Sequence, residues 1–432
     1  MKKTVIYNAT LVPMNEQMDV LPGGSLYIEG NTIREVAPSK IEREDAEYVD
    51  ARGMVVMPGF VNTHTHLPMA LLRGYADDLP LHRWLTDYIF PAEARWMTPE
   101  NVAVATRFAL IEMIKSGTTC FNDMYFFEEI IAREAKRAGV RGVVGESLID
   151  FPTPSFRTLE EGIARTESIL QEWKGDRLIT PGVCAHSPYT CSRETLRQAK
   201  QLSETYNCLL QIHVSETRKE VDDLLASEGK RPVEYLYGLG LLDNRTVVAH
   251  GVWLNEREID LLARCGTSVA HCPKSNLKLA SGIADTDTYL RRGVNVSLGT
   301  DGAASNNTLD MVEEMRFAAL LPKGVRQDPE AMNARQALRV ATINGARAVG
   351  LGDITGSLEV GKRADLLLVH LDASNAMPVY DVYSALVYAM NSKNVRSSMI
   401  DGQWVMRDRV MLTIDKEETM EAVRRLAREI RP

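Results

Sequence analysis

Eight short apolar runs alternate with longer helix-like stretches through the middle of the chain, and this alternation constrains the fold more than any other feature. The stretches carry helix caps, such as Thr98 before PENVAVATRFALIEMIKS and Gly117 after it, and Asn255 with Glu258, which resembles a capping box, before IDLLARCG. Alternation of this kind predicts a parallel sheet with crossover helices, and eight such units over about 300 residues are what a (β/α)8 TIM barrel requires. In chain order the runs are VVMPGFVNTH, TTCFND, RGVVGESL, ITPGVCAHS, LLQIHVSE, TVVAHG, TSVAHC and VNVSLGTD.

The two ends of the chain follow a different pattern. Short alternating runs such as TVIYNATLV and SLYIEGNTIREVA, separated by Gly, Pro and Asn, predict antiparallel hairpins. The stretch VRSSMIDGQWVMRDRVML near the other end has the same character. We therefore expect an α/β protein in which residues 1–58 plus 362–432 form a composite β-sandwich domain and residues 59–361 form the barrel.

Polar side chains suited to chemistry gather at the ends of the eight runs. In GFVNTHTHLP the period of two along a strand places His64 and His66 on one face. Barrel enzymes build their sites at the carboxyl ends of the strands, so these side chains are expected to meet there. They are His64 and His66 on the first run, His186 on the fourth, His213 and Glu216 on the fifth, His250 on the sixth, His271 on the seventh and Asp301 on the eighth.

This set of side chains predicts a metal site. A His-x-His pair supplies two ligands from one strand, and His213 and Asp301 could supply a third and a fourth. A divalent metal lowers the pKa of water from about 15.7 to near 7, which makes hydroxide available at neutral pH. Barrel hydrolases with two metals commonly bridge them with a lysine on the fourth strand, but ITPGVCAHSPY offers His186 instead, so we expect one metal.

Composition excludes other classes of protein. The net charge of −8 and the pI near 5.6 argue against binding of nucleic acid or of an anionic membrane surface. The N-terminal stretch MKKTVIYNATLVPMNEQ lacks the apolar region of a secretory signal, so a cytoplasmic location is expected. The six cysteines form no CxxC pair, and Cys184 and Cys272 fit core packing better than ligation. A lone histidine such as His271 is likewise more often a hydrogen-bonded core residue than a ligand.

Several motifs resemble those of the amidohydrolase superfamily, in its branch of purine and pyrimidine deaminases. The motifs are GFVNTHTHLP, QIHVSET, VVAHGV, HCPKSNLKLASGIA, LGTDGAASNNTLDM and GSLEVGKRADLLLV. Within that branch the chain is most similar to the 5-methylthioadenosine/S-adenosylhomocysteine deaminase family. The resemblance implies a barrel of the metal-dependent hydrolase type and a purine nucleoside as the small-molecule partner. A homo-oligomer is also expected.

The resemblance also implies roles for individual residues. His64, His66, His213 and Asp301 would bind one divalent ion, most often Zn²⁺, with Fe²⁺ and Mn²⁺ as alternatives. Glu216 would be the proton shuttle and His250 would hold the attacking hydroxide. The residues expected to contact the substrate are Glu93 at the ribose, His186 at the nucleoside, Glu216 and Asp301.

The implied reaction is hydrolytic deamination. The 6-amino group of adenosine, 5-deoxyadenosine, 5-methylthioadenosine or S-adenosylhomocysteine would leave as ammonia, giving the inosine analogue. Asp301 would accept a proton from the attacking water and Glu216 would protonate a ring nitrogen, so we expect surroundings that raise the pKa of Glu216.

One departure from the family bears on the substrate. Members that accept the homocysteine tail can place an arginine after the third strand, where it clamps a carboxylate. Here the region reads GVVGESLIDFPTPSF, with no arginine before Arg157. We therefore expect uncharged 5-substituents to be preferred.

Alternatives remain open at this stage. Glu93 could be a solvated carboxylate at a helix end, and Trp84 and Phe90 either wall the pocket or simply pack. The chain could be another amidohydrolase acting on an N-heterocycle, such as a guanine or cytosine deaminase or a triazine hydrolase. It could also be a catalytically silent barrel scaffold, although buried histidines and carboxylates without a metal would be costly.

Overall fold

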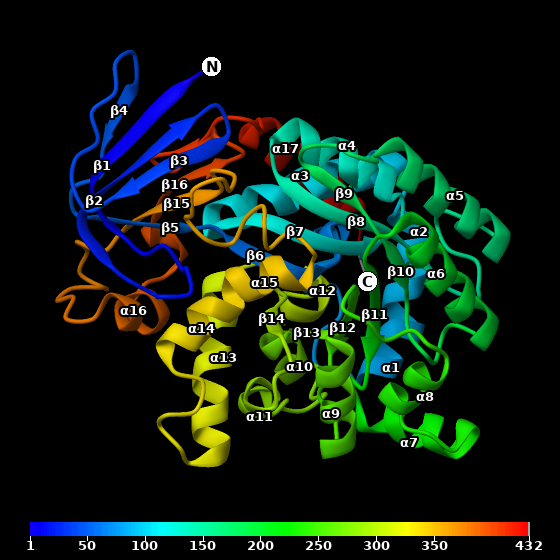
Figure 1. The fold of residues 1–432 in the computed structure, drawn as a ribbon. Coiled ribbons are helices and arrows are strands. Elements are labelled where there is room, and N and C mark those ends of the chain that lie inside the picture. Colours follow the sequence, from blue (N-terminus) through cyan, green and yellow to red (C-terminus); the bar gives the residue numbers. More distant parts are fainter. Residues whose placement is uncertain (431–432) are drawn as a thin grey trace.

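The computed structural model describes residues 1–430 and contains a parallel barrel and a second, mixed sheet (Figure 1). The barrel strands follow the order β14-β13-β12-β11-β10-β8-β7-β6, with β9 paired to β8. Each of the eight predicted runs contributes to this sheet, which confirms the predicted fold class. Their bounds are β6 Phe60–Thr65, β7 Thr118–Tyr125, β8 Arg141–Leu148, β9 Ile179–Pro181, β10 Val183–Ala185, β11 Leu210–Val214, β12 Thr246–His250, β13 Ser268–His271 and β14 Val296–Leu298.

Polar contacts join the first and last barrel strands across the seam. Thr63 Oγ1 lies 2.8 Å from Ser297 Oγ, and Asn62 Nδ2 donates to Thr300 Oγ1 at 2.8 Å. The backbone N–H of Asp301 donates to the carbonyl of His64 at 2.9 Å. This backbone hydrogen bond holds His64 and Asp301, which are 237 positions apart in the sequence, next to each other.

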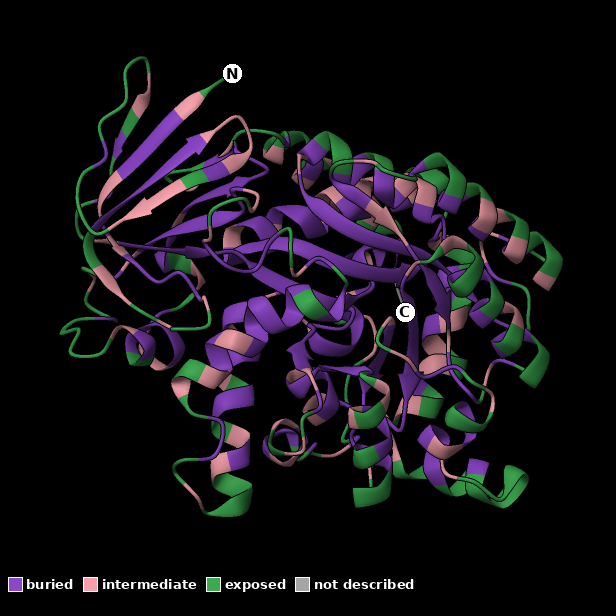
Figure 2. Ribbon diagram, in the orientation of Figure 1, coloured by how far each residue is buried: buried purple, intermediate pink, exposed green. Residues whose placement is uncertain are grey.

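Helices surround the barrel and bury their inner faces, while their outer faces are exposed (Figure 2). Sequence-predicted caps are present: Thr98 accepts a hydrogen bond from the N–H of Asn101, and Asn255 and Glu258 form a capping box. The helices around the barrel are α3 Pro99–Ser116, α4 Glu128–Ala138, α5 Leu159–Glu172, α6 Arg193–Tyr206, α7 Arg218–Glu228, α8 Pro232–Gly238, α9 Glu256–Cys265, α10 Pro273–Lys278, α11 Thr286–Arg291, α12 Ala303–Asn306, α13 Met311–Arg326, α14 Ala334–Ala341 and α15 Ile343–Ala348.

A further run of short helices follows β6 and supplies one wall of the cavity described below. It consists of η1 Leu67–Leu72, α1 Leu81–Arg83, the π-helix η2 Trp84–Ile89 and α2 Phe90–Trp96. Within residues 1–430, none of the helices combines the length and the apolar character that crossing a membrane demands.

Strands from both ends of the chain share the second sheet. Strand β5 pairs antiparallel with β15, and this joins the N-terminal strands to the C-terminal ones. The order is β18-β17-β16-β15-β5-β1-β2-β3, with β4 paired to β1. The bounds are β1 Lys3–Leu11, β2 Leu21–Glu29, β3 Thr32–Ala37, β4 Glu47–Asp50, β5 Met54–Pro58, β15 Leu366–His370, β16 Val395–Ile400, β17 Gln403–Arg407 and β18 Val410–Met411.

The predicted run VVMPGFVNTH belongs to both sheets and breaks at Gly59. A Cβ on Gly59 would lie 2.0 Å from Thr119 Oγ1, so only glycine allows the chain to pass here from β5 into β6. A buried ion pair also links the sheets, because Arg141 Nε in β8 lies 2.7 Å from Asp365 Oδ2.

The remaining C-terminal elements lie outside the second sheet. They are α16 Val382–Ser384, η3 Ala385–Ala389, η4 Ser392–Asn394 and α17 Lys416–Glu429, and α17 packs on α3 of the barrel. The domain boundaries at residues 59 and 361 stay a prediction.

Candidate active site

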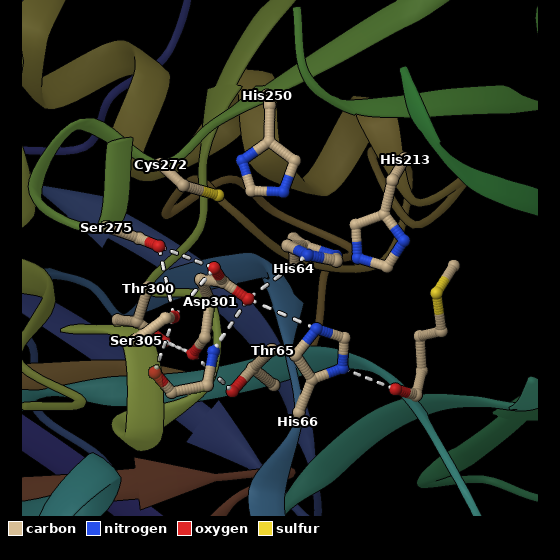
Figure 3. A network of polar contacts seen from close by, with 12 residues as sticks. His64, Thr65, His66, His213, His250, Cys272, Ser275, Thr300, Asp301 and Ser305 are labelled. Carbon is tan, nitrogen blue, oxygen red and sulfur yellow. Dashed lines mark hydrogen bonds and ion pairs between the residues drawn. The ribbon is translucent and has the colours of Figure 1, made fainter. Parts of the chain in front are cut away.

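The predicted ligands converge at the carboxyl end of the barrel. Figure 3 shows the rings of His64, His66, His213 and His250 and the carboxylate of Asp301 around one common space. All five residues are buried. The strand ends therefore bring together side chains that are far apart in the sequence.

Distances within this group suit a bound cation. His66 Nε2 and His64 Nε2 lie 3.1 Å and 3.5 Å from Asp301 Oδ1. Two ligand atoms each about 2.0–2.2 Å from a zinc ion in tetrahedral geometry are roughly 3.3–3.5 Å apart. The ligand atoms of His64, His66 and Asp301 lie within 4.8 Å of one another, and those of His64, His213 and His250 form a second such group.

The outer nitrogens of the histidines are held by hydrogen bonds. Nδ1 is bonded to Gln211 Oε1 at 3.1 Å in His64, to the carbonyl of Met124 at 2.5 Å in His66 and to the carbonyl of His186 at 2.6 Å in His213. An Nδ1–H that donates to oxygen leaves the lone pair on Nε2, which is the arrangement of a metal ligand. His64 Nε2 is buried and has no hydrogen-bond partner among the described residues, so its surroundings fit a metal ion.

Backbone strain accompanies the site. Ser215, His250 and Asp301 follow or end barrel strands with φ of 54°, 72° and 61°. This left-handed region is costly for residues with a side chain, and such residues cluster at functional sites where the surroundings hold them in place. The three turns rotate the ends of β11, β12 and β14 so that polar side chains face the common space.

Hydroxyl groups orient the Asp301 carboxylate. Its Oδ2 accepts hydrogen bonds from Ser275 Oγ at 2.6 Å and from Ser305 Oγ at 2.8 Å. Burial opposes ionisation, but the close approach of His64 and His66 to this carboxylate holds the pKa of Asp301 well below its usual range. The carboxylate is thus anionic and fixed toward the histidines.

Glu216 lies beside this group as the sequence predicted. Ser281 Oγ donates to Glu216 Oε1 at 3.0 Å, and His250 Nε2 lies 3.6 Å from Glu216 Oε2. His250 is oriented in turn by Asn276, whose Oδ1 is 2.9 Å from His250 Nδ1. Burial raises the pKa of Glu216, the direction expected for a residue that must carry a proton.

Glu93 and His186 line the same cavity as the metal-site residues. Glu93 is only 3% exposed and accepts a hydrogen bond from Tyr125 Oη at 2.6 Å, so it is not a solvated carboxylate at a helix end. Burial raises the pKa of Glu93 to about 7, against the hydrogen bond from Tyr125. His186 Nδ1 lies 2.8 Å from Thr190 Oγ1, and Trp84 and Phe90 are part of the cavity wall.

No lysine or arginine is among the residues that line this cavity in the described part of the chain. Ser147, near the end of β8, lines this cavity. Arg157 is exposed, and Arg165 Nη2 is paired with Glu129 Oε1 at 2.7 Å. The cavity continues outward into a second one of about 740 Å³, and the two share wall residues Leu81, Leu85, Tyr189 and Leu279.

The remaining residues discussed from the sequence are not among the clustered ligand atoms, although Cys272 lies next to His250 and Ser275 (Figure 3). His271 is buried, and burial lowers its pKa to about 3. Burial raises the thiol pKa of Cys184 and of Cys272 well above the usual value, as expected for unreactive core residues.

Sequence reasoning missed the residues that orient the site. Their shared property is a hydrogen bond to a predicted ligand or to a predicted catalytic residue. Most fall inside motifs that carried the family resemblance, and this is the only signal that could have found them. They are Gln211, Asn276, Ser275, Ser281, Ser305 and Tyr125.

Comparison with known proteins places this geometry in a family. Residues 55–405 match the amidohydrolase family. The chain is 47% identical to a 5-methylthioadenosine/S-adenosylhomocysteine deaminase of Syntrophobacter fumaroxidans, over 98% of this chain and 96% of that protein. It is 42% identical to a 5'-deoxyadenosine deaminase of Methanothermobacter thermautotrophicus, over 94% and 95%.

A solved structure of a deaminase is also similar to this chain. A zinc-bound adenosine deaminase from Xanthomonas campestris superposes with a TM-score of 0.97 at 39% identity, covering 99% of each chain. The family match includes every residue of the buried cluster, and the two relatives extend over nearly the whole chain. The chain therefore belongs to the amidohydrolase family.

Proposed function

We propose that this protein is a metal-dependent hydrolytic deaminase of adenine nucleosides with uncharged 5-substituents. The observation that carries the proposal is the buried group of four histidines and Asp301, with the Glu216 carboxyl beside it in one cavity. Relatives named as deaminases of 5-methylthioadenosine, S-adenosylhomocysteine and 5'-deoxyadenosine support the substrate class.

One divalent ion is proposed to bind to His64, His66, His213 and Asp301. Zn²⁺ is the first candidate because imidazole and carboxylate ligands suit it and because the similar adenosine deaminase structure contains zinc. Fe²⁺ and Mn²⁺ accept the same ligands. The ion would supply Lewis acidity, which allows water to ionise near neutral pH.

The protein's own residues would move the protons. Glu216, whose pKa is raised by burial, would donate a proton to a ring nitrogen of adenine, and this activates C6 toward attack. Asp301 would accept a proton from the attacking water, and His250 would contact the resulting hydroxide. The C–N bond then breaks, so that one water and one adenine nucleoside give ammonia and the inosine analogue.

Substrate binding is proposed to depend on Glu93 and His186. The Glu93 carboxyl, held by Tyr125, would bond the ribose hydroxyls, and His186 would contact the nucleoside. The inner cavity wall contains no lysine or arginine among the described residues that could pair with a carboxylate on the 5-substituent. The adjoining outer cavity has two lysines, Lys219 and Lys278, but these are already paired with Asp223 and Asp77, each at 2.6 Å. Adenosine, 5-deoxyadenosine and 5-methylthioadenosine should therefore be preferred to S-adenosylhomocysteine.

A panel of nucleosides tests the proposal. Purified protein loaded with zinc, iron or manganese is mixed with each adenine nucleoside, and ammonia release and loss of adenine absorbance are followed. Free adenine, guanine, cytosine and a triazine serve as the alternative substrates. Faster turnover of one of these alternatives, or of S-adenosylhomocysteine, would contradict the proposed specificity.

Two further measurements separate the remaining alternatives. Glu216→Gln should retain metal and lose nearly all turnover, and a variant that keeps most of its turnover would remove Glu216 from the mechanism. A protein that binds no ion and gains no activity with any of the three metals would be a scaffold. A homo-oligomer and a cytoplasmic location stay predictions from the sequence.

A further inference from the structure

Glu220 is a buried carboxylate that the mechanism above does not use. It is the third residue of α7, whose N-cap is Thr217, and it is only 6% exposed. Its two oxygens accept hydrogen bonds from the backbone N–H groups of Ser215, at 2.6 Å, and Glu216, at 2.8 Å. Both amides immediately follow strand β11, which carries His213.

This arrangement differs from an ordinary helix cap. In a capping box the third-position carboxylate accepts the N–H of the N-cap residue itself, as Glu258 does with Asn255 at 3.0 Å in α9. Glu220 instead reaches past Thr217 to the two residues before it. Its hydrogen bonds therefore hold the segment that carries Glu216 and not the start of the helix.

The segment held in this way is strained and is fixed from both sides. Ser215 has a φ of 54°, a conformation that needs support from its surroundings. Its carbonyl accepts the N–H groups of Val252 and Trp253, each at 3.0 Å. Its own N–H is bonded to Glu220, so the carboxylate supplies the support on the amide side.

The backbone here determines where the Glu216 carboxyl lies. Ser281 and His250, the latter at the end of the neighbouring strand β12, contact that carboxyl at 3.0 Å and 3.6 Å. A change of φ at Ser215 would move the Glu216 carboxyl relative to both contacts. A misplacement of about 1 Å in a reacting group can cost about 100-fold in rate.

We infer that Glu220 is a positioning residue for the proton transfer by Glu216: its carboxylate clamps the Ser215 and Glu216 amides in the strained turn that points the Glu216 carboxyl at the substrate. This inference rests on the proposed function and deepens it. Charge-assisted bonds of this length are stronger than neutral ones, and two of them act on consecutive amides.

The test uses Glu220→Gln, which keeps the shape of the side chain but leaves only one oxygen for two N–H donors. Glu161→Gln is the matched control. Glu161 is also a third-position glutamate behind a threonine cap, and its carboxylate accepts the N–H of Arg157 at 2.7 Å, but it lies on exposed α5 away from the cavity.

Two readouts are measured on the full-length metal-loaded proteins. Glu220→Gln should lower kcat for the best nucleoside about 10- to 100-fold, with KM changed less than about threefold, since the residue acts on proton transfer and not on binding. Hydrogen exchange of peptides that span Ser215 and Glu216 should be at least about tenfold faster. Glu161→Gln should change neither quantity.

Opposite results would overturn the inference. A Glu220→Gln enzyme with kcat within about twofold of the parent, or with unchanged exchange at Ser215 and Glu216, would show that the clamp does not position Glu216. Equal losses in Glu220→Gln and Glu161→Gln would assign both residues to helix stability alone. If the parent turns over none of the nucleosides, the proposed function is rejected instead. The hydrogen-exchange measurement needs no substrate, so it still tests the clamp by Glu220 in that case.

Discussion

Glu314 links the stability of the active-site loops to pH. The side chain is buried in α13, and it accepts hydrogen bonds from Asn306 Nδ2 at 2.7 Å and from the N–H of Lys274 at 3.2 Å. These partners flank Ser275 and Ser305, whose hydroxyls hold Asp301. Burial raises the pKa of Glu314 to about 8, against these hydrogen bonds.

The sign of the effect follows from the two pKa values. In the unfolded chain Glu314 ionises near 4.5, whereas in the folded protein it keeps its proton until about pH 8. Its contribution to stability is therefore fully present below pH 4.5 and is lost as the pH rises toward 8. Between pH 6 and pH 9 the loss covers about two pH units, or about 3 kcal/mol at about 1.4 kcal/mol per unit.

Glu314→Gln removes this loss because glutamine does not ionise. The free energy of unfolding in urea is measured for the variant and the parent at pH 6 and pH 9. The free energy of unfolding of the variant minus that of the parent should be about 3 kcal/mol larger at pH 9 than at pH 6. The stability of the variant at pH 6 alone is not the test, since the glutamine side chain also changes the hydrogen bonds with Asn306 and Lys274.

Glu313→Gln is the matched control next to it. Burial raises the pKa of Glu313, but hydrogen bonding and charge from Lys274 outweigh it, so the pKa lies below the usual value. Ionised Glu313 stabilises the folded protein, and this stabilisation is lost only when the pH falls toward its lowered pKa. The free energies of unfolding of variant and parent should therefore differ by the same amount at pH 6 and pH 9. The same constant difference for Glu314→Gln would refute the reasoning, because it would mean that Glu314 is already ionised at pH 6.

The remaining predictions concern the metal, the substrate and the two sheets. His64→Ala should bind less than about a tenth of the parent's zinc, measured by elemental analysis, because His64 belongs to both groups of clustered ligand atoms. Above pH 7, where Glu93 is ionised, Glu93→Gln should raise KM for nucleosides about 10-fold or more and leave metal content unchanged, because it loses a charged partner for the ribose hydroxyls; an unchanged KM would exclude that contact. Asp365→Asn should destabilise the protein by about 3 kcal/mol in urea, because it removes the nearer of the two carboxylates that pair with the buried Arg141 and leaves only Asp401 at 3.5 Å; a loss below about 1 kcal/mol would mean that the pair does not hold the sheets together.

Sequence periodicity was sufficient to identify the barrel strands. A parallel strand buried on both faces is a short apolar run between helix signals, and this pattern depends only on neighbouring residues. The limit of the method is visible at VVMPGFVNTH, where one continuous run divides between two sheets at Gly59. That division depends on Thr119, whose side chain lies within 2.0 Å of a Cβ placed at Gly59 and which is 60 positions away.

The candidate ligands could be named for a similar reason. Polar residues at the carboxyl ends of strands must share one face of a barrel, so His64, His213 and Asp301 could be grouped without knowing any distance. The same logic could not find Gln211 or Asn276. Each is one polar residue among many until the fold brings it within hydrogen-bond distance of a histidine.

Local pattern thus established the barrel, its chemically active face and the kind of chemistry, because these depend on residue types and on periods of two and 3.6 along the chain. Long-range packing decided everything that depends on distance. It set the burial that raises the pKa of Glu216 and the left-handed turn at Ser215. It also turned Glu220 back onto two backbone amides, because hydrogen bonds and desolvation act over a few ångströms in space whatever the separation in sequence.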